Sequence, residues 1–190
     1  MSIQYGIKII SDNLLLYYDT LNINSYPMSG SKWYNLAPIN VPLDIYNLSL
    51  QNPLFGFYYP GYSNKVCQAN TNGNINAYLG NNQSICAWIY ASSLNQSYQF
   101  FVGQRAPCLG INRYMGADPK FWYILHVNGE QKEVVTNKIC NLYTWYYVVG
   151  TYDGSNLKLY VNSNLEGITS AVGNYTNDFS DRLFQIGNWN

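Results

Sequence analysis

Charged residues are scarce in this chain. Of its 190 residues, 10 are Lys or Arg and 10 are Asp or Glu, so the net charge is zero and only 11% of side chains are charged. The basic residues are scattered from Lys8 to Arg182 and do not cluster. Proteins that bind nucleic acid electrostatically gather Lys and Arg on one face. The sequence therefore predicts no nucleic-acid partner.

Long apolar runs are also missing. A membrane-spanning helix needs about 20 consecutive apolar residues, and the chain has no such run. Residues 1–10 lack the basic stretch followed by an apolar stretch that marks a secretion signal. We expect no membrane insertion, and synthesis in a reducing cytoplasm.

The few cysteines and the single histidine do not form a metal-binding pattern. Cys67, Cys86, Cys108 and Cys140 are far apart, with no C-x-x-C pair, and His126 is the only histidine. Zinc sites need closely spaced Cys and His ligands. We expect free thiols that pack as small hydrophobic side chains.

Aromatic residues, by contrast, are abundant. They make up 17% of the chain and include 20 Tyr. Short runs rich in Tyr, Val and Ile recur about every ten residues between Asn, Gly, Ser and Pro, which is typical of an all-β sandwich. The predicted strands are Asn13–Asp19, Ser84–Tyr90, Gln99–Val102, Lys120–Val127, Lys132–Thr136, Trp145–Thr151, Leu157–Val161 and Leu183–Ile186. The one helix candidate is a single turn near Asp178–Arg182. No linker divides the chain, so we predict one antiparallel jelly-roll domain over residues 1–190.

The region from Trp145 to Gly167 predicts two successive hairpins. Residues 152–156, Tyr-Asp-Gly-Ser-Asn, have turn chemistry, and Leu157–Val161 then alternates apolar and polar residues. Residues 162–164 turn the chain again. Further upstream, Ser84–Tyr90 is apolar on both faces, which predicts a strand in the middle of a sandwich.

These stretches resemble the concanavalin A-like lectin/glucanase superfamily, and in particular its laminin-G-like members. Trp145–Gly167 is similar to the hairpin W-h-h-V-x-x-T-Y-D-G-x-x-L-x-L-Y-V-(D/N)-G, and Leu79–Ser93 is similar to the strand h-S-h-x-A-W-h-x-p-x-S. The resemblance implies a concanavalin A-like β-sandwich.

The opening of the chain resembles that of laminin-G-like proteins of tailed phages and other large DNA viruses. Asp12–Leu36 is similar to D-G-L-V-L-Y-L-D-A-x-N-x-x-S-Y-P-G-S-G-x-x-W-x-D-L. Asn13, Met28 and Asn35 replace the usual Gly, Gly and Asp. The resemblance implies a virion protein.

Two departures from the family pattern stand out. Val66–Asn70 lacks the acidic residues of the family's F-D-G-x-x-D-Y-h segment. Gln185–Asn190 stops before the family's usual C-terminal strand, so we expect that strand to be lacking. A neighbouring subunit could fill the edge that this leaves open.

The catalytic carboxylates of glucanases with this fold are not recognisable. Retaining hydrolysis needs two carboxylates about 5 Å apart on one face. Glu130 and Glu133 are three residues apart at a Gly-containing turn and do not match the spacing of a catalytic pair, and Glu166 has no acidic neighbour. The sequence has no G-x-S-x-G nucleophile elbow for which His126 could act as a general base. The sequence therefore predicts a protein that is not an enzyme.

A calcium site is not favoured either, although calcium is the family's usual cofactor. Asp153 belongs to a turn in which Asp-Gly is explained by backbone geometry. Asp19, Asp118, Asp178 and Asp181 form no D-x-D or D-x-N-x-D loop. We predict no metal site and no cofactor.

An aromatic loop, Phe55–Tyr62, offers weak candidates for ligand binding. If Tyr58, Tyr59 and Tyr62 are exposed, they form a platform for a sugar or a protein partner. If they are buried, they belong to the core or to subunit packing.

Taken together, these features lead us to expect a non-enzymatic viral structural protein in the virion, made in the host cytoplasm. It would decorate a capsid or form a fibre or adhesion module, with other virion proteins or copies of itself as partners. The alternative is a carbohydrate-binding, lectin-like domain for host recognition. A glycoside hydrolase is the third hypothesis, because the same fold hosts all three roles.

Overall fold

Strands make up all the regular structure in the described part of the chain. The computed structural model describes residues 12–48, 50–52, 56–57, 66–69, 79–94, 99–111, 118–177 and 183–187, and no helix occurs among them. These ranges accordingly contain no helix long and apolar enough to cross a membrane. The all-β prediction is confirmed.

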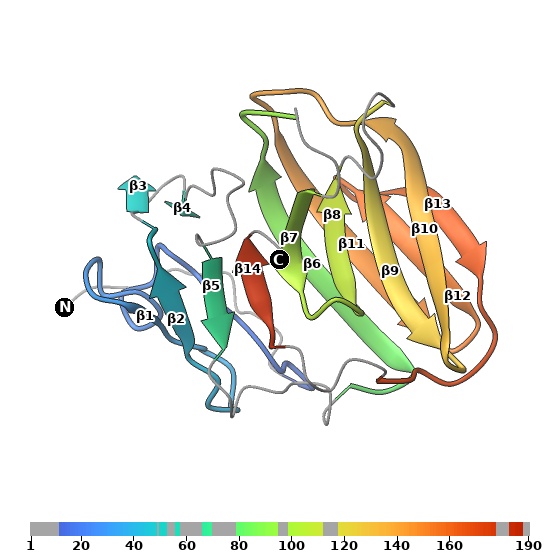
Figure 1. The fold of residues 1–190 in the computed structure, drawn as a ribbon, viewed down its shortest axis with the longest axis horizontal. Coiled ribbons are helices and arrows are strands. Elements are labelled where there is room, and N and C mark those ends of the chain that lie inside the picture. The colour runs from blue at the N-terminus through green and yellow to red at the C-terminus, as the bar shows by residue number, and fades with distance from the viewer. Residues whose placement is uncertain are drawn as a thin grey trace.

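The strands form two antiparallel sheets and one small ribbon (Figure 1). The eight-stranded sheet has the order β1 (Lys32–Trp33), β2 (Leu43–Tyr46), β5 (Val66–Ala69), β14 (Gln185–Gly187), β7 (Gln99–Gly103), β8 (Cys108–Ile111), β9 (Lys120–Val127) and β10 (Glu130–Ile139). The four-stranded sheet has the order β13 (Asn164–Ser170), β12 (Asn156–Val161), β11 (Trp145–Asp153) and β6 (Asn82–Tyr90). The ribbon pairs β3 (Leu50–Asn52) with β4 (Gly56–Phe57).

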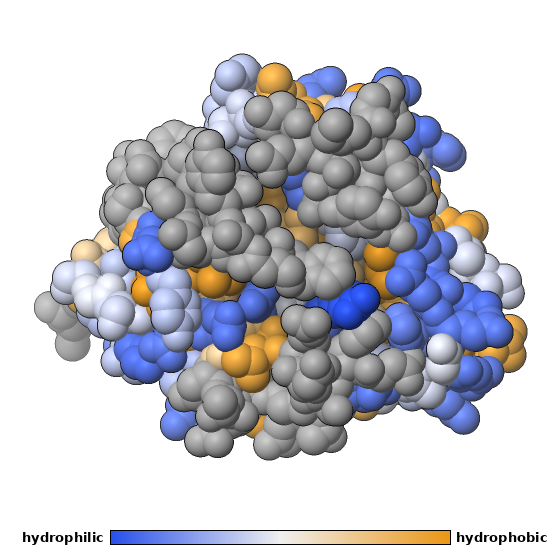
Figure 2. All heavy atoms as spheres, viewed as in Figure 1, coloured by the Kyte–Doolittle hydropathy of each residue, from blue (hydrophilic) through white to orange (hydrophobic). Residues whose placement is uncertain are grey.

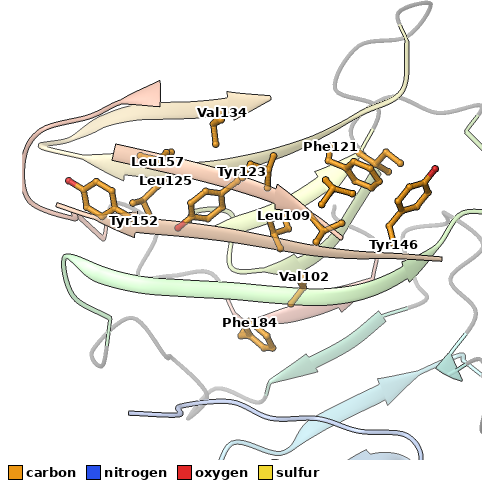
Figure 3. Close-up of a cluster of buried hydrophobic side chains, with 14 of the residues drawn as sticks. Val102, Leu109, Phe121, Tyr123, Leu125, Val134, Tyr146, Tyr152, Leu157 and Phe184 are labelled. Carbon is orange, nitrogen blue, oxygen red and sulfur yellow. The ribbon is translucent and has the colours of Figure 1, made fainter. Parts of the chain in front are cut away.

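The core lies between the two sheets, where β12 and β13 contact β10, and β6 contacts β7 and β8 (Figure 3). Leu157, Leu159 and Val161 of β12 are fully buried. The Tyr123 ring of β9 fits against Gly150 of β11, because a Cβ atom at Gly150 would lie 2.6 Å from the ring. The two layers therefore approach as closely as the residues between them allow.

Both predicted hairpins are present. β11 and β12 pair from Val148↔Val161 to Tyr152↔Leu157, and Gly154 adopts a positive φ of 83° in the turn. At the β12–β13 turn, Asn162 and Ser163 both have positive φ, 50° and 70°. Two consecutive residues with positive φ make the turn whose twist matches antiparallel strands.

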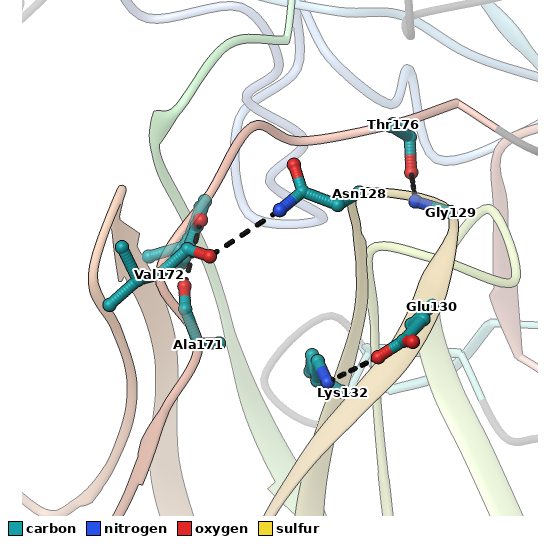
Figure 4. Close-up of polar contacts among 8 residues, drawn as sticks. Asn128, Gly129, Glu130, Lys132, Ala171, Val172 and Thr176 are labelled. Carbon is teal, nitrogen blue, oxygen red and sulfur yellow. Dashed lines mark hydrogen bonds and ion pairs between the residues drawn. The ribbon is translucent and has the colours of Figure 1, made fainter.

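A polar clamp of asparagines ties the segment after β13 to the two sheets. Asn128, in the β9–β10 turn, accepts a hydrogen bond from the Asn174 backbone N–H (2.9 Å) and donates to the Val172 carbonyl. Gly129 N donates to Thr176 Oγ1 (Figure 4). Asn81, just before β6, donates to Asn174 Oδ1 at 2.7 Å. This clamp fixes where the two sheets meet at this end.

The predicted strand Asn13–Asp19 is wrong, since these residues form no strand. The Asn35 side chain takes the place of a ladder partner: its Oδ1 accepts from Tyr17 N, and its Nδ2 donates to the carbonyls of Leu15 and Ile39. The segment still covers the core, because Tyr18 stacks on Phe184, next to β14.

The other predicted strands are present, with longer bounds for β6, β7, β10, β11 and β12. The last one is shifted: Leu183 and Phe184 form no strand, and β14 begins at Gln185 and ends at Gly187. Six strands were not predicted, and each of them spans only two to four residues: β1, β2, β3, β4, β5 and β8. The predicted helical turn at Asp178–Arg182 lies outside the described residues.

Candidate functional site: an aromatic face on the four-stranded sheet

The predicted ligand-binding residues Tyr58, Tyr59 and Tyr62 lie outside the described residues. Phe57, the neighbouring residue, is described and packs edge-on against Tyr26 and Trp33, with ring centroids 5.1 and 5.0 Å apart. Phe57, a described residue of the aromatic loop that carries these tyrosines, therefore packs within the protein.

An aromatic cluster that the sequence did not single out lies on the outward side of β6 and β11. Residues of these two strands alternate between the core and the outside, so that one set of rings points away from the second sheet. We define the aromatic face as Trp88, Tyr90, Tyr143, Trp145 and Tyr147. The exposed fractions of Trp88 and Tyr143 are 65% and 66%.

The strand register brings these rings together. Trp88 is directly opposite Tyr147, and Tyr90 is opposite Trp145. The ring centroids are 5.1 Å apart in the first pair and 5.3 Å apart in the second. Tyr143 extends the row, 6.3 Å from Tyr90. The rings are tilted by 37° to 57°, so they support one another while they stay exposed.

The same side of the sheet continues with few charges. Leu165 and Ile168 of β13 are 52% and 57% exposed. Lys158 lies between them and β11, but its charge is paired with Asp153 at 2.7 Å. By contrast, Figure 2 looks at the other side of the molecule, where hydrophilic residues gather over β9 and β10. The aromatic face is thus part of a larger apolar, charge-poor surface.

Cys86 borders this face, which corrects one prediction. Cys67, Cys108 and Cys140 are buried free thiols as predicted, but Cys86 is exposed. A hydrogen bond with Cys86, together with partial burial, raises the pKa of the Tyr147 hydroxyl to about 12. Tyr147 therefore stays a neutral phenol near neutral pH.

The prediction of β6 as a strand in the middle of the sandwich is wrong. Among the described strands, β6 lies at the edge of its sheet, and its outward residues are exposed along its whole length. Apolar residues on both faces fit a buried strand and a docking surface equally well. One signal was present in the sequence: Trp88 and Tyr90 share one face of Ser84–Tyr90, whereas the other face is purely aliphatic.

The acidic candidates Asp153 and Asp19 accept hydrogen bonds from neighbouring backbone and side-chain groups. Asp153 accepts hydrogen bonds from Lys158 Nζ and from the N–H groups of Ser155 and Asn156. These bonds, the Lys158 bond first, lower the pKa of Asp153 to about 2. Asp19 similarly accepts from Leu21 N and the Tyr17 hydroxyl.

Within the described ranges, no three His, Cys, Asp or Glu side chains are close enough to hold a metal. Asp118 is exposed there, and Asp178 and Asp181 fall outside these ranges.

The glutamates on β10 do not form a pair. Glu133 is opposite Ile124, on the outer side of the large sheet, whereas Glu130 is opposite the core residue Val127. Glu130 also forms an ion pair with Lys132 at 2.7 Å. Because the two carboxylates lie on opposite faces of β10, they cannot act together on one glycosidic bond. Glu166 lies at a bulge of β13, and His126 on β9 is buried.

Of the similarities to known proteins, the match to a family model agrees with this architecture. No curated protein matches the chain. Among solved structures, it is similar to domain 4 of AbnA, a GH43 extracellular arabinanase from Geobacillus stearothermophilus, in complex with arabinotriose. That likeness has 11% identity and a TM-score of 0.48, and covers 85% of this chain and 69% of the other. A family model, described as the concanavalin A-like lectin/glucanases superfamily, matches residues 61–190, which is more than half of the chain. The chain therefore belongs to the concanavalin A-like lectin/glucanases superfamily.

Proposed function

We propose that this protein is a non-enzymatic structural protein of a virion, and that it docks on neighbouring protein subunits through the aromatic face. One observation carries the proposal: five Trp and Tyr side chains are gathered on an outward sheet surface that has almost no unpaired charge. Protein interfaces are enriched in Trp and Tyr and depleted of charged residues in just this way.

The exposure of this surface supports a docking role. A large aromatic side chain gains roughly 1.5–3 kcal/mol when it is removed from water. Trp88 is 65% exposed, so most of that gain is unused in the free protein. Contiguous apolar patches of this kind on a soluble domain mark interaction sites. Tyr and Trp also lose little side-chain entropy on binding, because each has only two rotatable bonds.

The virion setting is supported by the opening of the chain. Asp12–Leu36 resembles the opening of laminin-G-like proteins of tailed phages and large DNA viruses. Capsid decoration and a place in a fibre both require extended protein contacts rather than catalysis. The partners would then be capsid or fibre subunits or further copies of this chain.

Mass spectrometry of purified virus particles tests the proposal. The protein should be present in stoichiometric amounts, and its absence from particles would refute a structural role. Particle binding by the purified protein should be lost in Trp88→Ala. The matched control is Tyr46→Ala on β2, whose side chain is 48% exposed but lies in the other sheet.

Carbohydrate binding is the second candidate, on the same aromatic face. Exposed rings stack on sugars, and a side-chain amide stands beside them: Asn162 accepts from Tyr147 N through its Oδ1. Its Nδ2 has no hydrogen-bond partner among the described residues, so this amide NH2 group can donate to a sugar hydroxyl.

A glycan array separates the two candidates. If the aromatic face binds sugar, Trp88→Ala and Trp145→Ala should lose the signal while Tyr46→Ala keeps it. Loss in Tyr58→Ala and Tyr62→Ala instead would place the sugar on the loop. No signal above background would remove the lectin hypothesis. We propose no metal cofactor for either function, so EDTA should leave binding unchanged.

A further inference from the structure

The backbone edge of β6 is separate from the aromatic rings, because it consists of main-chain groups in the plane of the sheet. β6 pairs with β11 along its whole length, from Asn82↔Asp153 to Tyr90↔Trp145. In the order β13-β12-β11-β6 it is the outermost strand, and no other described strand pairs with its far side. The site uses main-chain groups, so it stands whether or not the aromatic face binds a partner.

The hydrogen bonds of β11 show which groups of β6 point to the open side. Tyr147 exchanges two bonds with Asn162: its N–H donates to Asn162 Oδ1, and its carbonyl accepts from Asn162 N, each at 2.8 Å. The backbone of Tyr147 therefore faces β12, and by alternation the backbone of Val148 faces β6.

The β6 residues opposite Val148 and its even-numbered neighbours bond to β11. The N–H and C=O groups of the remaining β6 residues point away from the sheet. These residues are Asn82, Ser84, Cys86, Trp88 and Tyr90.

The core below this edge is incompletely covered. Ile85, Ala87 and Ile89 face inward and pack on the core but are only half-buried. Their partners on β11 include Tyr146 and Val148, which are 3% and 0% exposed. A further strand beside β6 would bury the inward side of β6 to the same degree, which is favourable in proportion to the apolar area removed from water.

β6 also lacks the features that protect edge strands. Its sequence, Asn-Gln-Ser-Ile-Cys-Ala-Trp-Ile-Tyr, has no charge, no Pro and no Gly. The opposite edge of the same sheet, β13, is shorter and contains Glu166, Gly167 and a bulge. The unprotected edge of this sheet is therefore β6.

The surroundings define what fits there. β6 lies over β7 and β8, so the next strand position lies over β14, whose inward Ile186 is also only half-buried. The N-terminal segment bounds this position, because Tyr18 packs on Phe184. Among the described residues, Ile186 and the Tyr18–Phe184 pair therefore lie next to this strand position.

We propose that the open edge of β6 accepts a single extended strand from a partner protein. The strand would be uncharged, and apolar at alternate positions so that these side chains meet Ile85, Ala87, Ile89 and Ile186. Its backbone would bond to Ser84, Cys86 and Trp88, as in other complexes in which a strand is added to a sheet.

Amide hydrogen exchange tests whether the edge is open. In the free protein, the amides of Ser84, Cys86 and Trp88 should exchange at least about tenfold faster than those of Ile85 and Ala87, which are bonded to β11. Equal protection of both sets would overturn the proposal.

A peptide probe tests whether the edge accepts a strand. The probe is an alternating Thr-Val peptide as long as β6 (9 residues) with a fluorescent label, and its control carries N-methyl groups at alternate residues. The protein should bind the first peptide and not the second, and binding should protect the Ser84, Cys86 and Trp88 amides.

Ser84→Pro should lower peptide affinity about tenfold or more, because it removes an N–H that points away from β11 and pairs with no described strand. Ser84→Ala, which keeps this N–H, should bind like the wild type. No peptide binding, or equal binding by Ser84→Pro with an unchanged melting temperature, would overturn the proposal. Dimers of the wild type that Ser84→Pro abolishes would overturn it too, in favour of a second copy.

Discussion

The inner and outer faces of the four-stranded sheet are built from similar residues but have different surroundings. On β11, Tyr146 and Val148 point inward and are at most 3% exposed, whereas Trp145 points outward and is 37% exposed. Both faces are aromatic or aliphatic. The difference arises from the eight-stranded sheet, which covers only one of them. Apolarity therefore shows that a surface needs a partner, but not whether that partner is the protein's own core.

The largest effect should come from shortening a side chain on the inner face. Leu159→Ala removes atoms from a fully buried position on β12, and should lower the free energy of unfolding by about 2–5 kcal/mol. Leu165→Ala, at the outward and 52% exposed position of β13, should stay within about 0.5 kcal/mol. Urea denaturation measures both. Equal losses would contradict the assignment of the two faces.

Adding one methyl group between the layers should be the next most damaging change. Gly150→Ala would place a Cβ atom 2.6 Å from the Tyr123 ring, and should cost about 1–3 kcal/mol. Gly80→Ala is the matched control, because no atom lies within 4 Å of its added Cβ. Thermal melts of the two variants would differ little only if the sheets were packed more loosely at Gly150.

Removing a hydroxyl from the inner face should have a smaller effect. The Tyr152 hydroxyl donates to the carbonyl of Ala171 or Gly173, at 3.0 and 2.7 Å. Tyr152→Phe should cost about 0.5–1.5 kcal/mol. Tyr160→Phe, on the outward side of β12, should be neutral because its hydroxyl has no described hydrogen bond. A stability loss in Tyr160→Phe as large as in Tyr152→Phe would be inconsistent with this view.

Changes on the outer face should affect binding rather than folding. Trp88→Ala should change the free energy of unfolding by no more than about 0.5 kcal/mol. It should nevertheless abolish binding to virus particles, with Tyr46→Ala as the control. A large loss of stability in Trp88→Ala would mean that the aromatic face is structural.

The smallest effect concerns pH and the turn between the two central strands. Because the pKa of Asp153 is lowered to about 2, its charged form stabilises the folded state. That contribution is complete above the usual Asp pKa of about 4 and is lost as the pH falls toward 2. The melting temperature of Asp153→Asn should thus fall less steeply than that of the wild type between pH 5 and 2, measured by circular dichroism. Parallel pH profiles would exclude this role for Asp153.

Local patterns gave much of the fold. Strict alternation in Leu157–Val161 and turn residues at Asp153-Gly154 predicted β12 and its hairpin correctly. The segment Asn13–Asp19 misled, because its apolar run is satisfied by the Asn35 side chain instead of a strand. Nothing in the sequence around Asn35 indicates that its side chain will take the hydrogen bonds of a strand partner.

The candidate site was harder to foresee. The sequence pointed to Tyr58 and its neighbours, because aromatic density in a loop is easy to recognise. The aromatic face instead brings together Trp88 and Tyr147, which are far apart in the chain and meet only through the register of β6 with β11. Pairing between distant strands depends on the whole fold and cannot be predicted from the sequence of either strand alone.

The place of β14 in the large sheet has a consequence for how this protein is made. The β11–β12–β13 meander joins neighbouring segments through tight turns, so it can form as soon as it leaves the ribosome. β14 (Gln185–Gly187), however, pairs with both β5 and β7, which are synthesised much earlier. Until β14 is synthesised, the edges of β5 and β7 that pair with it have no partner in the nascent chain. The large sheet can be joined only after the small one has had time to fold.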